Sequence, residues 1–194
     1  IAKLRKLPVE AVITASRNGY LCGAIVDGHN CFVIRDGTFA QARRLCGGTL
    51  RTSKGDTKAK NLEGAQGAFI GHGPWLGDKS VKVLLVEGAV GLLEGIAAEY
   101  LAEPNGGWTV IAATSAGSRF TRDPELLAAL AGRHVVIVAD NDEAGITGAL
   151  SWLTDLEAVG CTVRVTQAPD DHKDLGPLAA HPETHMPTLK ALFQ

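Results

Sequence analysis

The sequence predicts an α/β protein in which a mainly parallel sheet carries helices on both faces, preceded by a small basic α+β subdomain. Short apolar runs alternate with helical patterns through residues 80–166, which is typical of parallel strands connected by helices. Two of these runs, 81–86 and 135–139, consist almost wholly of aliphatic residues, like strands buried on both faces. Residues 1–75 instead show the sequence patterns of short strands and turns together with many basic residues, which predicts a separate subdomain.

The first 75 residues are expected to form a helix followed by short strands. Apolar residues at helical spacing open the chain, so we expect it to be a piece of a longer protein. The expected strands are 21–26, 31–35 and 40–45, the first two joined by a turn that contains Asp-Gly, a hairpin signal. Residues 49–60 are polar and basic and are expected to form an exposed loop. Glycine and proline at 71–74 predict a boundary.

From residue 80 onward, strands and helices are expected to alternate. The expected order is strand 81–86, helix 89–101, strand 108–113, a helix opened by Asp123-Pro124-Glu125, strand 135–139, helix 143–159 and strand 161–166. Leu92, Ile96 and Tyr100 fall on one apolar face of the first helix. The chain thus divides into a basic subdomain at 1–75, the α/β domain at 76–180 and a helical tail at 181–194.

Composition excludes several classes of protein. Of the 194 residues 45% are hydrophobic and 21% charged, which is ordinary for a globular domain. No apolar run approaches the roughly 18 residues of a membrane span. The four cysteines form no Cys-x-x-Cys pair, so we expect reduced thiols in a cytoplasmic protein rather than a zinc site or disulfides. Walker A, dinucleotide-binding, zinc-protease and serine-hydrolase motifs are also missing.

The net charge of −2 hides a division along the chain. Residues 1–75 carry 11 Lys and Arg against 5 Asp and Glu, whereas residues 76–194 carry 8 against 16. A basic part beside an acidic part suggests that one binds a polyanion and the other binds cations. Two differently charged surfaces without a ligand would give the same division.

Three acidic residues stand at the ends of the two most apolar strands. Glu87 follows the run 81–86, and Asp140 and Asp142 follow the run 135–139. Ligands of open α/β sheets bind at the carboxyl ends of strands. If the two strands are neighbours, three carboxylates crowd into one volume, and a divalent cation is the simplest way to offset their repulsion.

Each acidic motif also has a structural interpretation. Many strands end in an acidic residue, so Glu87 taken alone carries little weight. Asp142 or Asn141 would be a suitable cap for the helix that follows, with Glu143 near its positive end. The charged segment 170–174 after the last strand is an ordinary solvated loop or, because of its position, a supporting part of the same site.

Taken together, Glu87-Gly88, the segment Asp140-Asn141-Asp142-Glu143-Ala144-Gly145 and Lys173-Asp174-Leu175 resemble the motifs of the Toprim domain. Bacterial-type primases, topoisomerases and some nucleases share this domain. The resemblance covers about residues 80–180 and implies a Toprim-type sheet. It also implies that Glu87, Asp140 and Asp142 are catalytic and bind Mg²⁺ or Mn²⁺, with Asp174 as a further ligand.

The segments 40–45, 58–64 and 69–71 are similar to the subdomain that precedes the Toprim domain in DnaG-like primases, most of all those of phages and mobile elements. The resemblance implies that basic residues there face the template and nucleotides. By position these nucleic-acid and nucleotide ligands are Arg43, Arg44, Lys58, Lys60 and Asn61. Such primases carry a further aspartate four residues after the glutamate, where this chain has Gly91.

The resemblance therefore implies a primase catalytic core, a nucleotidyltransferase that makes short RNA primers on single-stranded DNA from nucleoside triphosphates. It leaves a replicative helicase open as a partner. Two alternatives remain open at this point: a metal-dependent Toprim nuclease, and a module that binds nucleic acid without catalysis.

Overall fold

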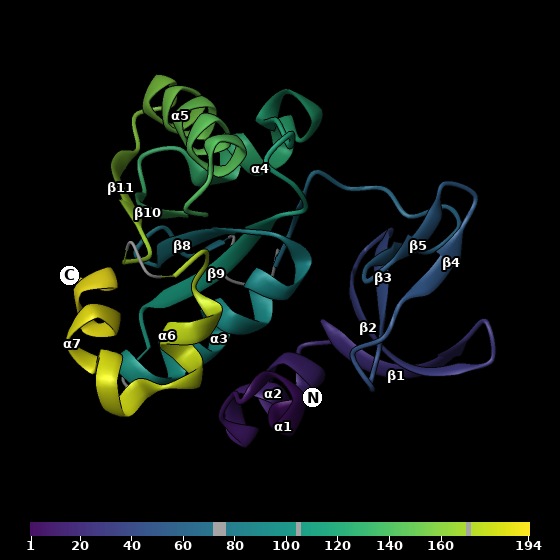
Figure 1. Cartoon of the computed structure of the whole chain (residues 1–194). Helices are drawn as coiled ribbons and strands as arrows, with labels where there is room; N and C mark the ends of the chain where they lie inside the picture. Colours follow the sequence, from purple (N-terminus) through teal and green to yellow (C-terminus); the bar gives the residue numbers. More distant parts are fainter. Residues whose placement is uncertain (72–76, 104–105, 170–171) are drawn as a thin grey trace.

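The centre of the molecule is a five-stranded sheet in the order β11-β10-β8-β9-β7. A computed structural model describes residues 1–71, 77–103, 106–169 and 172–194 (Figure 1). The strands of this sheet are β7 (Phe69–Ile70), β8 (Lys82–Glu87), β9 (Trp108–Ala113), β10 (His134–Ala139) and β11 (Thr162–Gln167). All neighbours pair in parallel except β7, which is antiparallel to β9. The predicted α/β class with a mainly parallel sheet is confirmed.

Helices cover both faces of this sheet (Figure 1). On one face lie α3 (Ala89–Ala102), α6 (Gly176–Ala180) and α7 (Pro182–Leu192). On the other lie the 3₁₀ helix η2 (Phe120–Arg122), α4 (Pro124–Leu130) and α5 (Glu143–Ala158). The buried residues accordingly form two clusters, because successive side chains of each strand point to opposite faces: Leu84 and Val86 belong to one cluster, and Val83 and Leu85 to the other.

The amino-terminal part contains two helices and two small sheets. Its elements are α1 (Ala2–Arg5), α2 (Val9–Arg17), β1 (Leu21–Val26), β2 (His29–Asp36), β3 (Phe39–Arg44), β4 (Leu50–Thr52), β5 (Gly55–Thr57) and β6 (Lys60–Asn61). The expected hairpin between β1 and β2 is present, and its turn residues Asp27 and Gly28 both have positive φ, as a type I′ turn requires. Helix α2 packs on α3, so the two parts of the chain share one apolar core.

The structure differs from two of the sequence expectations and leaves a third as a prediction. Residues 49–60 were expected to be a loop, which is wrong in part, because β4 and β5 form a hairpin there. Leu50 anchors it in a small apolar cluster, and Thr52 stabilises its turn by hydrogen bonds to Lys54 and Gly55. Tyr100 was expected on the apolar face of its helix but is 44% exposed. Most of the predicted boundary at 71–74 lies outside the described residues, so the division of the chain at 75 stays a prediction.

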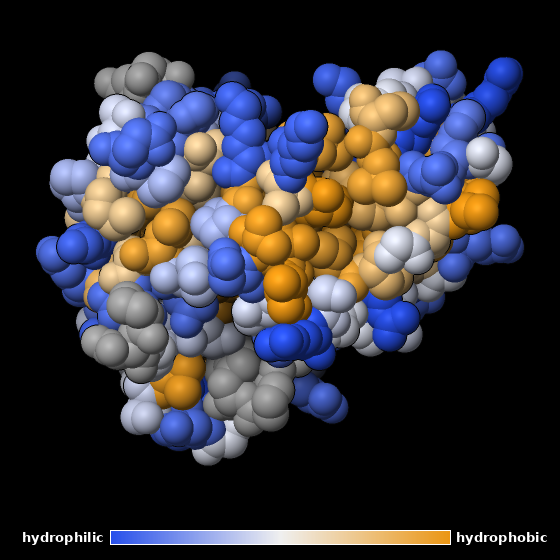
Figure 2. Space-filling model, turned by 90° about the horizontal axis from the view of Figure 1, so that it is seen from below, coloured by the Kyte–Doolittle hydropathy of each residue, from blue (hydrophilic) through white to orange (hydrophobic). Residues whose placement is uncertain are grey.

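The outer surface of the molecule carries both polar and apolar side chains. Figure 2 shows apolar surface gathered in the centre of the lower face and extending toward the amino-terminal sheet. The exposed large apolar side chains of α1, α2 and β1 are Leu4, Val9, Ile13 and Ile25. None of the helices in the described ranges combines the length and apolar character that crossing a membrane demands.

Candidate metal and nucleic-acid site

Strand pairing brings the predicted carboxylates to one edge of the sheet. Strands β8 and β10 are direct neighbours, with Val86 opposite Val138. Glu87 ends β8, and Asp140 follows the last residue of β10. Helix α3 leaves β8 toward one face of the sheet and α5 leaves β10 toward the other (Figure 1), and strand ends arranged in this way are where open α/β sheets bind their ligands. The neighbouring strands on which the metal hypothesis depended are therefore present.

Glu87 is oriented by the loop that follows β9. The backbone N–H of Ala116 donates to Oε1 of Glu87 at 3.0 Å. Its other oxygen, Oε2, is buried and has no hydrogen-bond partner among the residues that the structure describes. Burial raises the pKa of Glu87 against the opposing effect of the Ala116 hydrogen bond, and the nearby charge of Asp142 raises it further. A buried carboxylate oxygen without a donor is the kind of atom that a cation would satisfy.

Asp140 experiences the strongest crowding of negative charge. Its pKa is raised from the ordinary 3.8 to about 7. Burial is the largest cause, followed by the charges of Glu87, Asp174 and Asp142. The carboxylates are thus close enough to oppose one another's ionisation.

Asp142 has a different role from the other two in the structure. Its Oδ1 accepts a hydrogen bond of 2.9 Å from the N–H of Gly145 and caps α5. Its Oδ2 lies 3.0 Å from Nζ of Lys173. The capping interpretation is therefore correct for this residue, and these two contacts lower its pKa, the helix cap most of all.

The loop after β11 is tied to the turn after β10. The N–H of Asn141 donates to the carbonyl of Lys173 at 2.6 Å. Asp174 follows directly, and its Oδ1 accepts from the N–H of Gly176 at the start of α6. The charged loop that sequence analysis placed beside the strand ends thus lies there, although Asp170 and Asp171 fall outside the described residues.

A cavity of about 200 Å³ lies at these strand ends. Of the predicted acidic residues, Glu87, Asp140 and Asp174 line it, whereas Asp142 does not. Gly91 also lines it, so the position without an aspartate faces the site. Two further lining residues, Arg5 and Glu94, were missed by sequence analysis. Glu94 lies inside the apolar helix α3, and Arg5 is 89 residues away from it in sequence. The signal in the sequence that could have pointed to Glu94 is a charged residue in an otherwise apolar helical stretch.

A hard cation at this cavity would need oxygen donors from the side chains that line it. Within the described ranges, no three His, Cys, Asp or Glu side chains stand close enough to enclose an ion by themselves. The chemistry nevertheless fits: Glu87 offers an oxygen that no described residue contacts by a hydrogen bond, and the ionised Asp140 carries the repulsion that a cation would relieve. Mg²⁺ commonly binds one or two carboxylates and keeps several waters. Glu87 and Asp140 are therefore the residues that would hold it.

The residues predicted to bind nucleic acid do not all lie in one place: Arg43, Arg44 and Lys58 line one groove, and the other two lie elsewhere. Arg43 lines the acidic cavity, and it also lines a shallow groove of about 160 Å³ together with Arg44, Lys58 and Arg5. The groove and the cavity thus share Arg5 and Arg43. This arrangement places a cationic surface directly beside the carboxylates.

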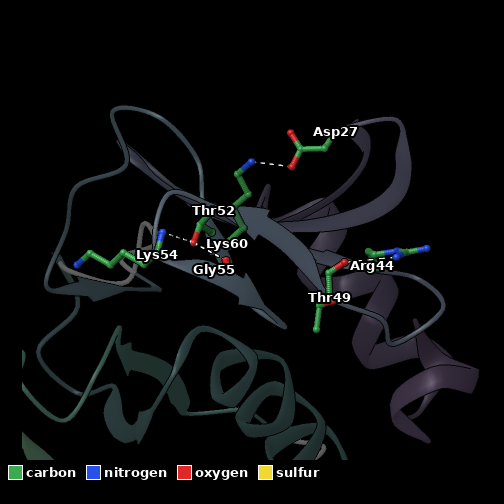
Figure 3. Close-up of polar contacts among 7 residues, drawn as sticks. All are labelled: Asp27, Arg44, Thr49, Thr52, Lys54, Gly55 and Lys60. Carbon is green, nitrogen blue, oxygen red and sulfur yellow. Dashed lines mark hydrogen bonds and ion pairs between the residues drawn. The ribbon is translucent and has the colours of Figure 1, made fainter.

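The other two predicted ligands lie away from that groove. Lys60 of β6 pairs with Asp27, with Nζ 2.6 Å from Oδ2, as Figure 3 shows. Asn61 accepts a hydrogen bond from the side chain of Gln41. Figure 3 also shows the contact of Arg44 with the carbonyl of Thr49. A lysine that is already paired contributes less to the binding of a polyanion than the exposed Lys58.

Comparison with family models and with curated protein sequences gives no match. Solved structures do match over almost the whole chain. The primase fragment of the bacteriophage T7 primase–helicase protein is 19% identical with a TM-score of 0.62, covering 99% of this chain and 73% of that one. The zinc-binding and RNA polymerase domains of the Aquifex aeolicus primase are 19% identical with a TM-score of 0.55, covering 96% and 49%.

A third match is the RNA polymerase domain of Mycobacterium tuberculosis primase DnaG in complex with double-stranded DNA. It is 18% identical with a TM-score of 0.53, covering 93% of this chain and 59% of that one. At these identities the similarity concerns the fold. The chain has the fold found in the catalytic domains of primases.

Proposed function

We propose that this chain is the catalytic core of a DNA primase, which joins ribonucleotides into short RNA primers on a single-stranded DNA template with Mg²⁺ or Mn²⁺. The observation that carries the proposal is the junction of an acidic cavity and a basic groove through Arg5 and Arg43. Nucleotidyl transfer needs both: carboxylates for a cation and cationic side chains for phosphates. The resemblance of the acidic motifs to a Toprim domain and the fold shared with primases support it.

The proposed roles follow from position. Glu87 and Asp140 hold the cation, which when bound neutralises charge on the triphosphate and orients it for in-line attack. Asp174 adds negative charge to the same wall of the cavity, while Lys173 and the cap of α5 hold Asp142 in place. Arg43, Arg44 and Lys58 bind phosphates of the template and nucleotide, mostly without reading sequence.

Product analysis tests this proposal. The chain is incubated with single-stranded DNA, labelled ribonucleotides and Mn²⁺ or Mg²⁺, with Glu87→Gln and the exposed-surface variant Glu157→Gln in parallel. We expect short RNA products from the wild type and Glu157→Gln and none from Glu87→Gln. Cleavage of the template that Glu87→Gln loses would instead identify a nuclease. The absence of any product, together with an inability to bind Mn²⁺, would identify a module without catalysis.

Lys58 and Lys60 should differ in their effect on DNA binding. Lys58→Ala should weaken binding of single-stranded DNA and lower the slope of log affinity against log salt by about 1, because one phosphate contact is lost. Lys60→Ala should change the slope less, because Asp27 already neutralises Lys60. Fluorescence anisotropy at several salt concentrations measures both, with the exposed Lys190→Ala on α7 as the control. Equal slopes for Lys58→Ala and Lys190→Ala would exclude Lys58 from DNA binding.

A further inference from the structure

Glu94 is an acidic residue in the interior of α3. Its side chain is 4% exposed, and its helical neighbours Leu92, Leu93 and Ile96 are buried apolar residues. Burial raises its pKa and the charge of Asp174 raises it further, whereas Arg5 and Arg43 lower it. A buried carboxylate is retained in a protein when it has a partner, because an unpaired one is costly. The identity of this partner indicates what Glu94 does.

The partner is Arg5 of α1, 89 residues away in sequence. Nη2 of Arg5 pairs with Oε1 of Glu94, and the Arg5 side chain stays 34% exposed. One end of this ion pair is thus buried, while the guanidinium keeps N–H donors on its open side. Arg5 lines both the acidic cavity and the basic groove, so those donors lie at the junction of the two.

Arg43 of β3 stands beside this ion pair. Burial lowers the pKa of Arg43, the charge of Arg5 lowers it further, and the carboxylate of Glu94 raises it. Glu94 therefore offsets the repulsion between two guanidinium groups that share one small space. Without this carboxylate, the two guanidinium groups would lose the anion that offsets their repulsion, and the more exposed one, Arg5, would move toward solvent.

The carboxylate of Glu94 has room only because residue 176 is a glycine. A Cβ atom on Gly176 would lie 2.7 Å from Oε1 of Glu94 and 3.1 Å from Oδ1 of Asp174. Glu94 and Asp174 thus meet at the start of α6, where the acidic wall of the cavity adjoins the arginines. This close fit connects the ion pair directly to the candidate site.

We propose that Glu94 is a positioning residue that holds Arg5 beside Arg43 at the mouth of the acidic cavity, so that both guanidinium groups bind the phosphates of the incoming nucleotide opposite Glu87 and Asp140. This inference rests on the proposed function and adds a specific nucleotide-binding role for Arg5. It also gives α1 a function, since α1 supplies one of the two cations.

Nucleotide kinetics test the role of the ion pair. Arg5→Ala and Glu94→Gln should each raise KM for the nucleoside triphosphate by about 10-fold or more, the size of one charged hydrogen bond, with kcat changed less than about 3-fold. The double variant should be no worse than either single one, because both changes remove the same contact. Glu99→Gln on the same helix and Arg17→Ala on α2 are matched controls and should leave KM unchanged.

A second double variant separates positioning from stability. Arg5→Met with Glu94→Met removes both charges and fills their space, so its melting temperature should equal or exceed that of the wild type. We expect it to keep the high KM and the weak binding of a fluorescent ATP analogue. If this variant has the wild-type KM, the ion pair is structural only and the inference is wrong. A wild-type chain that binds no nucleotide would instead overturn the proposed function, and this inference with it.

Discussion

Asp140→Asn is expected to reduce catalysis strongly and, at the same time, to stabilise the protein. Catalysis should fall about 100-fold or more, because several kcal/mol of charge stabilisation depend on the cation. Stability should rise by about 1–2 kcal/mol at pH 8, well below the full value of the pKa shift, because the side chain is only half buried and solvent screens it. The melting temperature should then increase by roughly 2–8 °C.

The pH dependence of this gain follows from the direction of the shift. The folded protein holds the Asp140 proton up to about pH 7, whereas the unfolded chain releases it near the ordinary value of 3.8. Wild-type stability contributed by this group therefore falls as the pH rises from about 4 to about 7. The advantage of Asp140→Asn should be absent near pH 4, grow up to about pH 7 and stay constant above it. Calorimetry without divalent cation, with Glu157→Gln as control, measures it; a variant less stable than wild type at pH 8 would contradict the crowding of charge.

Gly145→Ala is expected to lower both stability and activity. A Cβ atom there would lie 2.5 Å from the carbonyl oxygen and 2.8 Å from Cβ of Asp140, so either the start of α5 or the end of β10 must move. Such overpacking costs about 1–3 kcal/mol, which corresponds to a decrease in melting temperature of roughly 2–12 °C. Activity should fall by at least about 10-fold even below that temperature, because Asp140 is displaced.

The matched control for this change is Gly23→Ala in β1, where a Cβ atom meets nothing within 4 Å and φ is negative or extended. It should change the melting temperature little. If Gly145→Ala behaves like this control in both melting and primer synthesis, the close approach of α5 to Asp140 does not position the carboxylate.

The elements that sequence analysis predicted are those with a local signal. The apolar runs of β8 and β10 and the acidic residue after each determined the edge of the sheet where the candidate site lies. Asp142 was predicted both as a helix cap and as a ligand, and the structure shows the cap and a lysine partner. Its role as a ligand stays a prediction, because no local pattern separates a capping carboxylate from a metal ligand.

The features that were missed depend on contacts between distant parts of the chain. Arg5 and Glu94 are brought together by the packing of the amino-terminal helices on α3, which periodicity does not specify. Lys58 and Lys60 look equivalent in sequence, but in the structure Lys58 lines the basic groove, whereas Lys60 pairs with Asp27. The short β4–β5 hairpin depends on one buried side chain, Leu50, in an otherwise polar segment.

Binding of Mn²⁺, followed by the loss of its free paramagnetic resonance signal, tests most directly whether the acidic cavity is the catalytic metal site. Wild type and the control Glu157→Gln should bind Mn²⁺ saturably, and added ATP should tighten that binding because the basic side chains hold its phosphates nearby. Glu87→Gln and Asp140→Asn should each weaken binding by at least about 10-fold, since each removes a carboxylate ligand. Equal Mn²⁺ binding by Glu87→Gln and the wild type would contradict the assignment of the acidic cavity as the metal site and would show that Mn²⁺ binds elsewhere on the chain.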